Sequence, residues 1–113
     1  MEEEDFERKW QKVVYHFIQL TGKKPNMDII LFMIGIQELG KGQLQFTKEQ
    51  KQDLMHVAVC KVLSQSGYYI LEGNDEEGWP HYKQVKELPV MIAMEQENFI
   101  KDHVLLYFEQ AGF

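Results

Sequence analysis

Apolar residues recur at helical spacing over most of the chain. Between about Glu3 and Thr21, a single apolar stripe repeats every three or four positions and consists of Phe6, Trp10, Val13, Val14, Phe17 and Leu20. Such spacing places these side chains on one side of a helix. Gly22 follows as a stop signal. We therefore predict a first helix that ends at Thr21.

The segment Met27–Leu39 is apolar on nearly every side. A surface helix keeps a polar face, whereas a helix that is apolar all round belongs inside a bundle or against a partner. We therefore expect a helix here, capped by Asn26, at the centre of the fold. Gly35 lies inside it and costs about 1 kcal/mol relative to alanine. The compensation we expect is the close approach of a neighbouring helix.

Thr47 and Gln50 have the spacing of a capping box, which predicts the start of a third helix that runs to about Ser64. Within residues 68–85, two runs that favour β-structure flank a turn rich in glycine and acidic residues. This order predicts a short hairpin. Pro89 is a favourable first residue for a last helix that extends to about Gln110.

These elements predict a mainly α fold with about four helices, packed as a small bundle around the helix at 27–39. The hairpin at 68–85 precedes the last helix. A chain of 113 residues buries roughly two thirds of its unfolded surface, which is enough for one stable core. We expect a single domain over residues 1–113.

The charge of the chain restricts the classes of partner. Eighteen acidic and twelve basic residues give a formal net charge of −6, and the lysines are scattered. Without a basic stripe to neutralise phosphates, we expect no binding to nucleic acid. The apolar run at 27–39 is shorter than the roughly 20 residues that span a bilayer, so we expect no membrane partner. The acidic N-terminus and the single cysteine indicate a cytoplasmic protein.

Three residues of the predicted third helix combine into a possible catalytic strip. Asp53, His56 and Cys60 lie at positions i, i+3 and i+7, so they share one side of the helix. A histidine beside a cysteine can lower the thiol pKa and produce a nucleophile. The simpler interpretation is that Cys60 is a packing residue, because free cysteine is among the most frequently buried residue types. We favour the simpler interpretation.

Metal and cofactor sites lack their usual motifs. The chain has no Glu-x-x-His pair on two helices and no His-Glu-x-x-His sequence. We therefore expect no metal and no cofactor.

The predicted hairpin turn is a candidate binding surface. It combines acidic side chains with aromatic ones, namely Asp75, Glu76, Glu77, Trp79, His81 and Tyr82. Exposed aromatic residues beside charges are typical of protein-binding loops. The alternative is a solvated turn whose Trp79 folds back over the core.

The last helix has more apolar surface than a small domain usually needs, and Val104 and Phe108 belong to this surplus. Either three neighbouring helices enclose it, or it forms an interface with a second copy or another protein. The function we favour from sequence is a small helical binding or scaffolding domain that self-associates as a homo-oligomer or binds a protein partner. The alternative is a small enzyme or ligand-binding protein that uses His56 and Cys60 or the hairpin turn.

Overall fold

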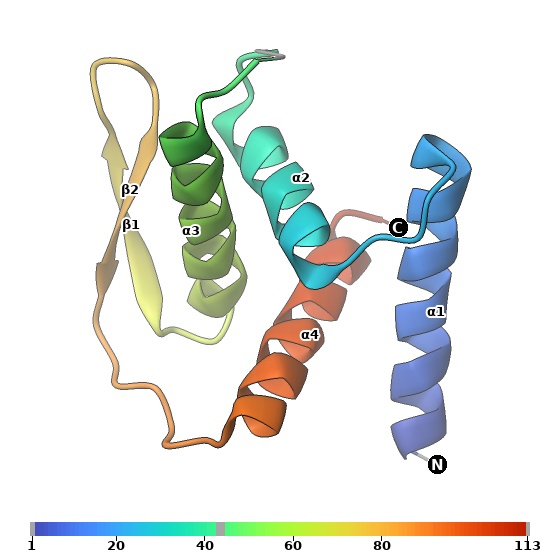
Figure 1. Cartoon of the computed structure of the whole chain (residues 1–113). Coiled ribbons are helices and arrows are strands. Elements are labelled where there is room, and N and C mark those ends of the chain that lie inside the picture. Colours follow the sequence, from blue (N-terminus) through green and yellow to red (C-terminus); the bar gives the residue numbers. More distant parts are fainter. Residues whose placement is uncertain (1, 43–44, 113) are drawn as a thin grey trace. The chain divides into compact units, whose positions relative to one another are not determined.

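The structure of the chain is a computed structural model that describes residues 2–42 and 45–112, with side chains from Asp5 onward (Figure 1). The described residues form helices and strands in the order α1 (Glu2–Thr21), α2 (Met27–Leu39), α3 (Lys48–Ser64), β1 (Tyr69–Asn74), β2 (Pro80–Gln84) and α4 (Ala93–Gln110). The predicted mainly α fold with a hairpin before the last helix is confirmed. No helix within these ranges is both long and apolar enough to cross a membrane.

The chain divides into two compact units. The continuous unit is Met27–Val90, which contains α2, α3 and the hairpin. The terminal unit combines Met1–Asn26 with Met91–Phe113, and so contains α1 and α4. The expectation of one domain over residues 1–113 stays a prediction.

In the continuous unit, α2 packs closely against α3. Gly35 of α2 lies against the Leu54 backbone, and a Cβ built on Gly35 would be 2.7 Å from the Leu54 carbonyl carbon. The predicted close approach at Gly35 is therefore confirmed. The buried residues of α2 are Ile30, Leu31, Ile34, Gly35 and Leu39.

The described residues do not cover α2 on every side. Ile29 and Met33 are 43% and 39% exposed, because the described neighbours cover one side of the helix. Phe32 is half-buried and makes an edge-to-face contact with Phe46, with ring centroids 5.9 Å apart. Mean apolarity alone did not distinguish a helix enclosed on every side from one packed along a broad face.

The start of α3 is fixed by the predicted capping box. The Gln50 backbone N–H donates to the Thr47 hydroxyl at 3.1 Å, and the Thr47 backbone N–H donates to Oε1 of Gln50 at 2.9 Å. Two backbone donors that a helix start leaves without partners are thereby satisfied. The predicted end at Ser64 is also confirmed.

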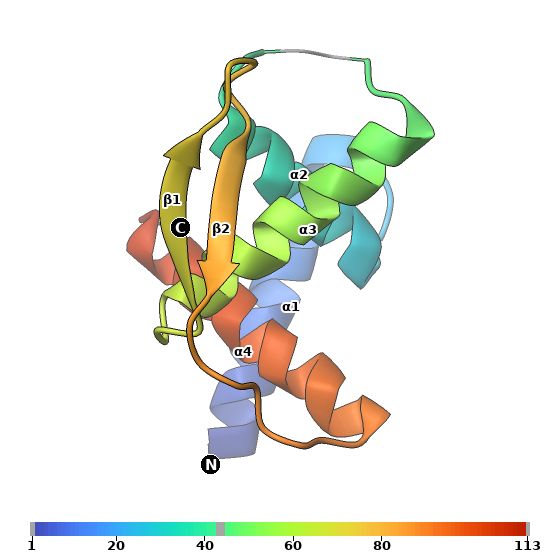
Figure 2. The ribbon, with the colours of Figure 1, turned by 90° about the vertical axis from the view of Figure 1, so that its left-hand side faces the viewer.

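The hairpin lies along α3, as the view from the hairpin side shows (Figure 2). Its strands pair in antiparallel fashion, with Tyr69 opposite Gln84 and Leu71 opposite Tyr82. The register shifts between Leu71 and Gly73, so the strand carries a β-bulge. The predicted hairpin at 68–85 is confirmed.

In the terminal unit, α1 and α4 contact each other along their lengths. Lys101 Nζ lies 5.1 Å from the centroid of the Trp10 ring. Seven residues further along each helix, which is about two turns, the Phe17 and Phe108 rings meet edge to face at 6.2 Å. Both helices rise from start to end in the two ribbon views, so α1 and α4 run in the same general direction (Figures 1 and 2).

The predicted start of α4 at Pro89 is wrong, because the helix begins at Ala93. Ile92 is the extended cap residue, and its backbone N–H donates to Oε1 of Glu95 at 3.1 Å. The carboxylate of the third helical residue thus replaces the start signal that we assigned to proline. Residues 87–92 belong to no helix or strand, and the Val90 side chain is fully exposed.

Candidate functional site

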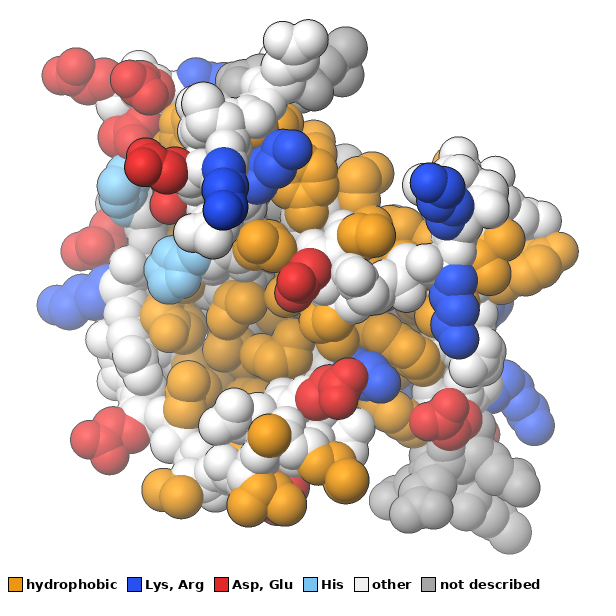
Figure 3. Space-filling view, in the orientation of Figure 1, with side chains coloured by type: hydrophobic (Ala, Val, Ile, Leu, Met, Phe, Trp, Pro, Cys, Tyr) orange, Lys and Arg blue, Asp and Glu red, His pale blue; other side chains and the backbone are white. Residues whose placement is uncertain are grey.

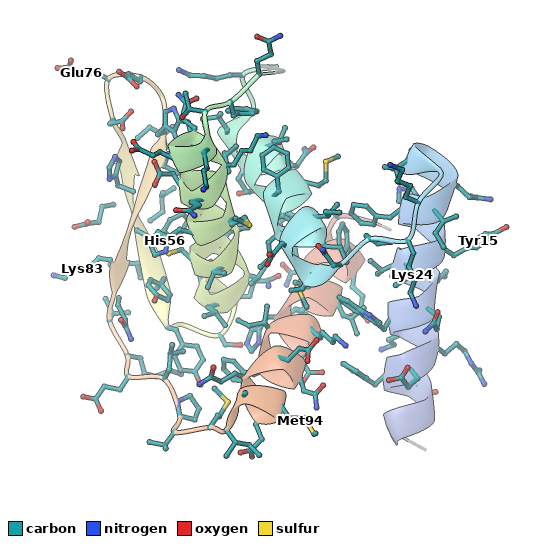
Figure 4. All side chains as sticks on the ribbon, viewed as in Figure 1. Tyr15, Lys24, His56, Glu76, Lys83 and Met94 are labelled. Carbon is teal, nitrogen blue, oxygen red and sulfur yellow. The ribbon has the colours of Figure 1, made fainter. Side chains whose placement is uncertain are left out.

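A hollow of about 380 Å³ lies between α3 and the hairpin. We call it the α3–hairpin hollow. Its lining comes from α3 and from the second half of the hairpin, and consists of Gln50, Asp53, His56, Val57, Cys60, Asp75, Glu77, Trp79, Pro80, His81 and Tyr82. All of these residues belong to the continuous unit. In Figure 4, the labelled His56 lies on the side of α3 that faces the hairpin strands.

The catalytic strip predicted on α3 borders this hollow. Asp53 and His56 are exposed, whereas Cys60 is only 1% exposed. The Cys60 Sγ lies 3.5 Å from Nε2 of His56. The two side chains are therefore in contact, as their spacing on a helix requires.

Burial opposes a nucleophilic role for this cysteine. It raises the pKa of the Cys60 thiol to about 11 from its ordinary value of 9.0. The reactive form of a cysteine is the thiolate, so a thiol with this pKa is almost entirely unreactive at neutral pH. The contact with His56 does not lower the pKa of the Cys60 thiol below its ordinary value. Cys60 therefore resembles a buried packing residue more than a nucleophile.

On the hairpin side, Asp75 organises the turn. Its Oδ1 accepts hydrogen bonds from the backbone N–H groups of Glu77 and Trp79, both at 2.9 Å. Its Oδ2 lies 2.9 Å from Nε2 of His81. The bond with His81 contributes most to lowering the pKa of Asp75, and the two backbone bonds act in the same direction. Asp75 is therefore an ionised residue that shapes the turn.

The aromatic residues of the hairpin form part of the wall. Trp79 and Tyr82 are both half-buried, so Trp79 is neither fully solvated nor enclosed in the core. Burial, and to a smaller extent the charges of Glu38 and Cys60, raise the pKa of Tyr82 to about 12. Its phenol is neutral at physiological pH and keeps an O–H donor.

Most of the candidate surface on the hairpin therefore meets the catalytic strip of α3 in one hollow. Acidic side chains gather with histidine toward this end of the molecule (Figure 3). Glu76 does not line the hollow, and it lies at the outer end of the turn (Figure 4). No group of three His, Cys, Asp or Glu residues within 5–42 and 45–112, where side chains are described, is arranged to hold a metal ion.

Sequence reasoning missed Gln50, Val57 and Pro80 as lining residues. The sequence indicates Gln50 only as part of the helix cap, yet Gln50, Val57 and Cys60 are separated by seven and three positions and so share one side of α3. If the strip from Asp53 to Cys60 is extended toward the start of the helix, it reaches Gln50, so this spacing could have predicted that Gln50 lines the hollow.

The candidate surface on α4 is not part of this hollow. Val104 is fully buried, so the expectation that it lies on an exposed interface is wrong. Phe108 is half-buried and packs edge to face against Phe17. The apolar surplus of α4 is used at least partly within the terminal unit, because α1 supplies aromatic contacts to it.

A second hollow, of about 450 Å³, lies between α1 and α4. Lys9 Nζ lies 3.0 Å from Oε1 of Glu109, so one of the three carboxylates in its lining is paired, and Asp5 and Asp102 also line it. Its histidine, His103, has Nδ1 2.7 Å from the Phe99 carbonyl oxygen. Unlike the α3–hairpin hollow, this hollow already contains a lysine, which is paired with one of its carboxylates.

Comparison of the chain with protein-family models, with curated proteins and with solved structures finds no match. The functional argument therefore depends on the geometry and charge of the α3–hairpin hollow.

Proposed function

We propose that this protein is a binding module that recognises a partner protein through the α3–hairpin hollow. The observation that carries the proposal is the convergence of two sets of polar and aromatic side chains, one from α3 and one from the hairpin, on a single hollow of about 380 Å³. Binding pockets commonly have volumes of about 300–1,000 Å³ and combine apolar walls with a few polar groups. The hollow is at the small end of that range, which suits one or two side chains of a larger partner.

The composition of the hollow supports binding better than catalysis. Its only thiol is protonated at neutral pH, because burial raises the pKa of Cys60 to about 11. Asp75 is occupied by His81 and by the backbone of the turn. By contrast, aromatic residues such as Trp79 and Tyr82 are enriched where proteins bind one another.

We also propose that the protein acts in the cytoplasm. A free, buried cysteine is usual in compartments that keep thiols reduced. Self-association is a special case of the same proposal, in which the occupant of the hollow comes from a second copy.

Site-specific photo-crosslinking in the protein's own cells tests this proposal. A benzoylphenylalanine at Glu76 places the crosslinker beside the hollow without replacing a lining residue. The matched control carries it at Lys83, which points away from α3 on the outer side of the hairpin (Figure 4). We expect a crosslinked partner from position 76, none from position 83, and loss of the adduct in a Trp79→Ala variant that keeps the wild-type circular dichroism spectrum.

Adducts of equal yield at both positions, no adduct at either, or an adduct that Trp79→Ala leaves unchanged would contradict the proposal. Mass spectrometry of the adduct identifies the partner. An adduct with a second copy of the chain would show that the protein is its own partner.

A further inference from the structure

The chemistry of the α3–hairpin hollow also indicates what enters it. We propose that the hollow receives the cationic side chain of a lysine or arginine from the partner protein. This inference rests on the function proposed above and specifies the class of group that is recognised.

The first argument is the sign of the charge. The lining contains the carboxylates of Asp53, Asp75 and Glu77, and it contains no lysine or arginine. Asp75 already holds the turn together. The carboxylates of Asp53 and Glu77 are exposed, and neither makes a hydrogen bond or ion pair with another side chain in the part of the chain that the structure describes. Asp53 therefore remains to neutralise an incoming cation, and Glu77 can also do so, although Lys41 Nζ lies close by, 3.3 Å from the position that a Cβ on Gly78 would occupy.

The second argument comes from the aromatic walls. A cation over an aromatic face is stabilised by the negative potential of the ring. Two other aromatic rings of this chain have a lysine over their faces. Lys86 Nζ lies 4.1 Å from the centroid of the Tyr68 ring, and Lys101 Nζ lies 5.1 Å from the centroid of the Trp10 ring. No lysine or arginine in the described ranges is placed over Trp79 or Tyr82 in this way. Two half-buried rings thus border the hollow without a cation.

The third argument is the combination of apolar and charged groups. Val57 and Pro80 supply apolar surface beside the carboxylates, and the methylene stems of lysine and arginine pack on such surface while their charged ends reach polar groups. A purely apolar occupant would remove Asp53 and Glu77 from water without compensation. An anionic occupant would be repelled by the same carboxylates.

Titration of the ¹⁵N-labelled full chain, followed by NMR, tests this inference. The probes are Nα-acetyl-lysine amide and Nα-acetyl-arginine amide, and the neutral control is Nα-acetyl-glutamine amide. We expect saturable shifts of the Trp79 indole N–H and of the backbone at 53–60 and 75–82 with a cationic probe. For single residues, the Kd should be on the order of 1–10 mM. The glutamine probe should produce no saturable shift.

Variants show whether the carboxylates are responsible. Asp53→Asn and Glu77→Gln should each weaken cation binding about fivefold. Glu76→Gln is the matched control, because Glu76 is adjacent in sequence but does not line the hollow, and it should change the Kd by less than about twofold. If a variant loses the dispersed spectrum of a folded protein, the salt dependence of binding to the wild-type protein is measured in place of that variant. We expect 0.5 M NaCl to weaken cation binding severalfold.

Equal shifts with the neutral probe, binding that salt and both carboxylate substitutions leave unchanged, or no saturable shift with either cation would overturn the inference. Its failure is distinguishable from failure of the proposed function. A position-specific crosslink at Glu76 without cation binding would preserve the binding function and reject the cationic occupant, whereas absence of that crosslink would reject the function itself.

Discussion

Gly35 of α2 and Leu54 of α3 are in such close contact that a Cβ on Gly35 would lie 2.9 Å from the Leu54 Cβ. The Leu54 carbonyl group is also adjacent to that position, and backbone atoms in the middle of a helix move at a much greater cost than the end of a flexible side chain. The absence of a side chain at residue 35 is therefore what allows the two helices to approach.

The first prediction follows from this contact. Gly35→Ala should destabilise the fold by about 1–3 kcal/mol, because overpacking outweighs the roughly 1 kcal/mol that alanine contributes to helix propensity. Urea unfolding followed by circular dichroism measures the difference. Gln37→Ala is the control on an exposed face of α2 and should change stability by less than about 0.5 kcal/mol. A Gly35→Ala protein as stable as the wild type would show that α2 and α3 can separate without loss.

The second prediction concerns the cap of α3. Thr47→Ala removes the acceptor for the Gln50 backbone N–H and should cost about 1 kcal/mol. Thr47→Ser keeps a hydroxyl at the same place, so it should retain most of the stability. If both variants unfold at the wild-type urea concentration, the capping box does not contribute to stability.

The third prediction is that Cys60 reacts slowly. A thiol that is 1% exposed is both protonated and inaccessible, so native protein should react with iodoacetamide at least about 100-fold more slowly than urea-unfolded protein. His56→Ala should leave this slow rate unchanged. Rapid labelling of native protein at pH 7, abolished by His56→Ala, would instead support the nucleophile hypothesis.

The fourth prediction uses the same residue at high pH. Because the folded pKa of Cys60 is raised from 9.0 to about 11, the unfolded chain loses this proton first as the pH rises, and stability should fall between pH 9 and 11. Two pKa units correspond to about 2–3 kcal/mol at the upper end of this window. Urea unfolding at pH 8 and pH 10.5 measures the loss. Cys60→Ala should reduce it, while the contribution of Tyr82 should remain.

The fifth prediction concerns the turn. The pKa of Asp75 is lowered from 3.8, so its ionised form stabilises the turn, and this contribution is lost as the pH falls through the lowered pKa. Asp75→Ala should abolish slow hydrogen exchange at the Glu77 and Trp79 amides at pH 6, whereas Asp75→Asn, which keeps one acceptor oxygen, should retain part of it. Unchanged exchange in Asp75→Ala would mean that backbone pairing alone fixes the turn.

Local signals in the sequence were sufficient for most elements. The end of α1 at Thr21, the bounds of α2 and the capping box of α3 depend on residues that are neighbours in the chain, so their patterns were readable. The start of α4 was missed because Pro89 and Glu95 both mark helix starts. The observed hydrogen bond from Ile92 to Glu95 selects the second.

The candidate site was predictable only in its parts. The spacing of Asp53, His56 and Cys60 placed them on one side of a helix, and composition identified Trp79 and its acidic neighbours as a binding turn. Their meeting depends on the hairpin lying along α3, which is a tertiary relationship between residues at least 15 positions apart. The spacing of apolar residues within α3 or within the hairpin does not show that the two elements contact each other.

The division of the chain into a continuous unit, Met27–Val90, and a terminal unit from both ends has a consequence for biosynthesis. Chains emerge from the ribosome N-terminus first, so α1 is made before α2, α3 and the hairpin, and α4 is made after them. We expect α2, α3 and the hairpin to assemble on the ribosome while the apolar stripe of α1, which includes Trp10 and Phe17, still lacks α4. During that interval the nascent chain presents this stripe to chaperones, and a premature stop before Met91 would leave it permanently without its helical partner.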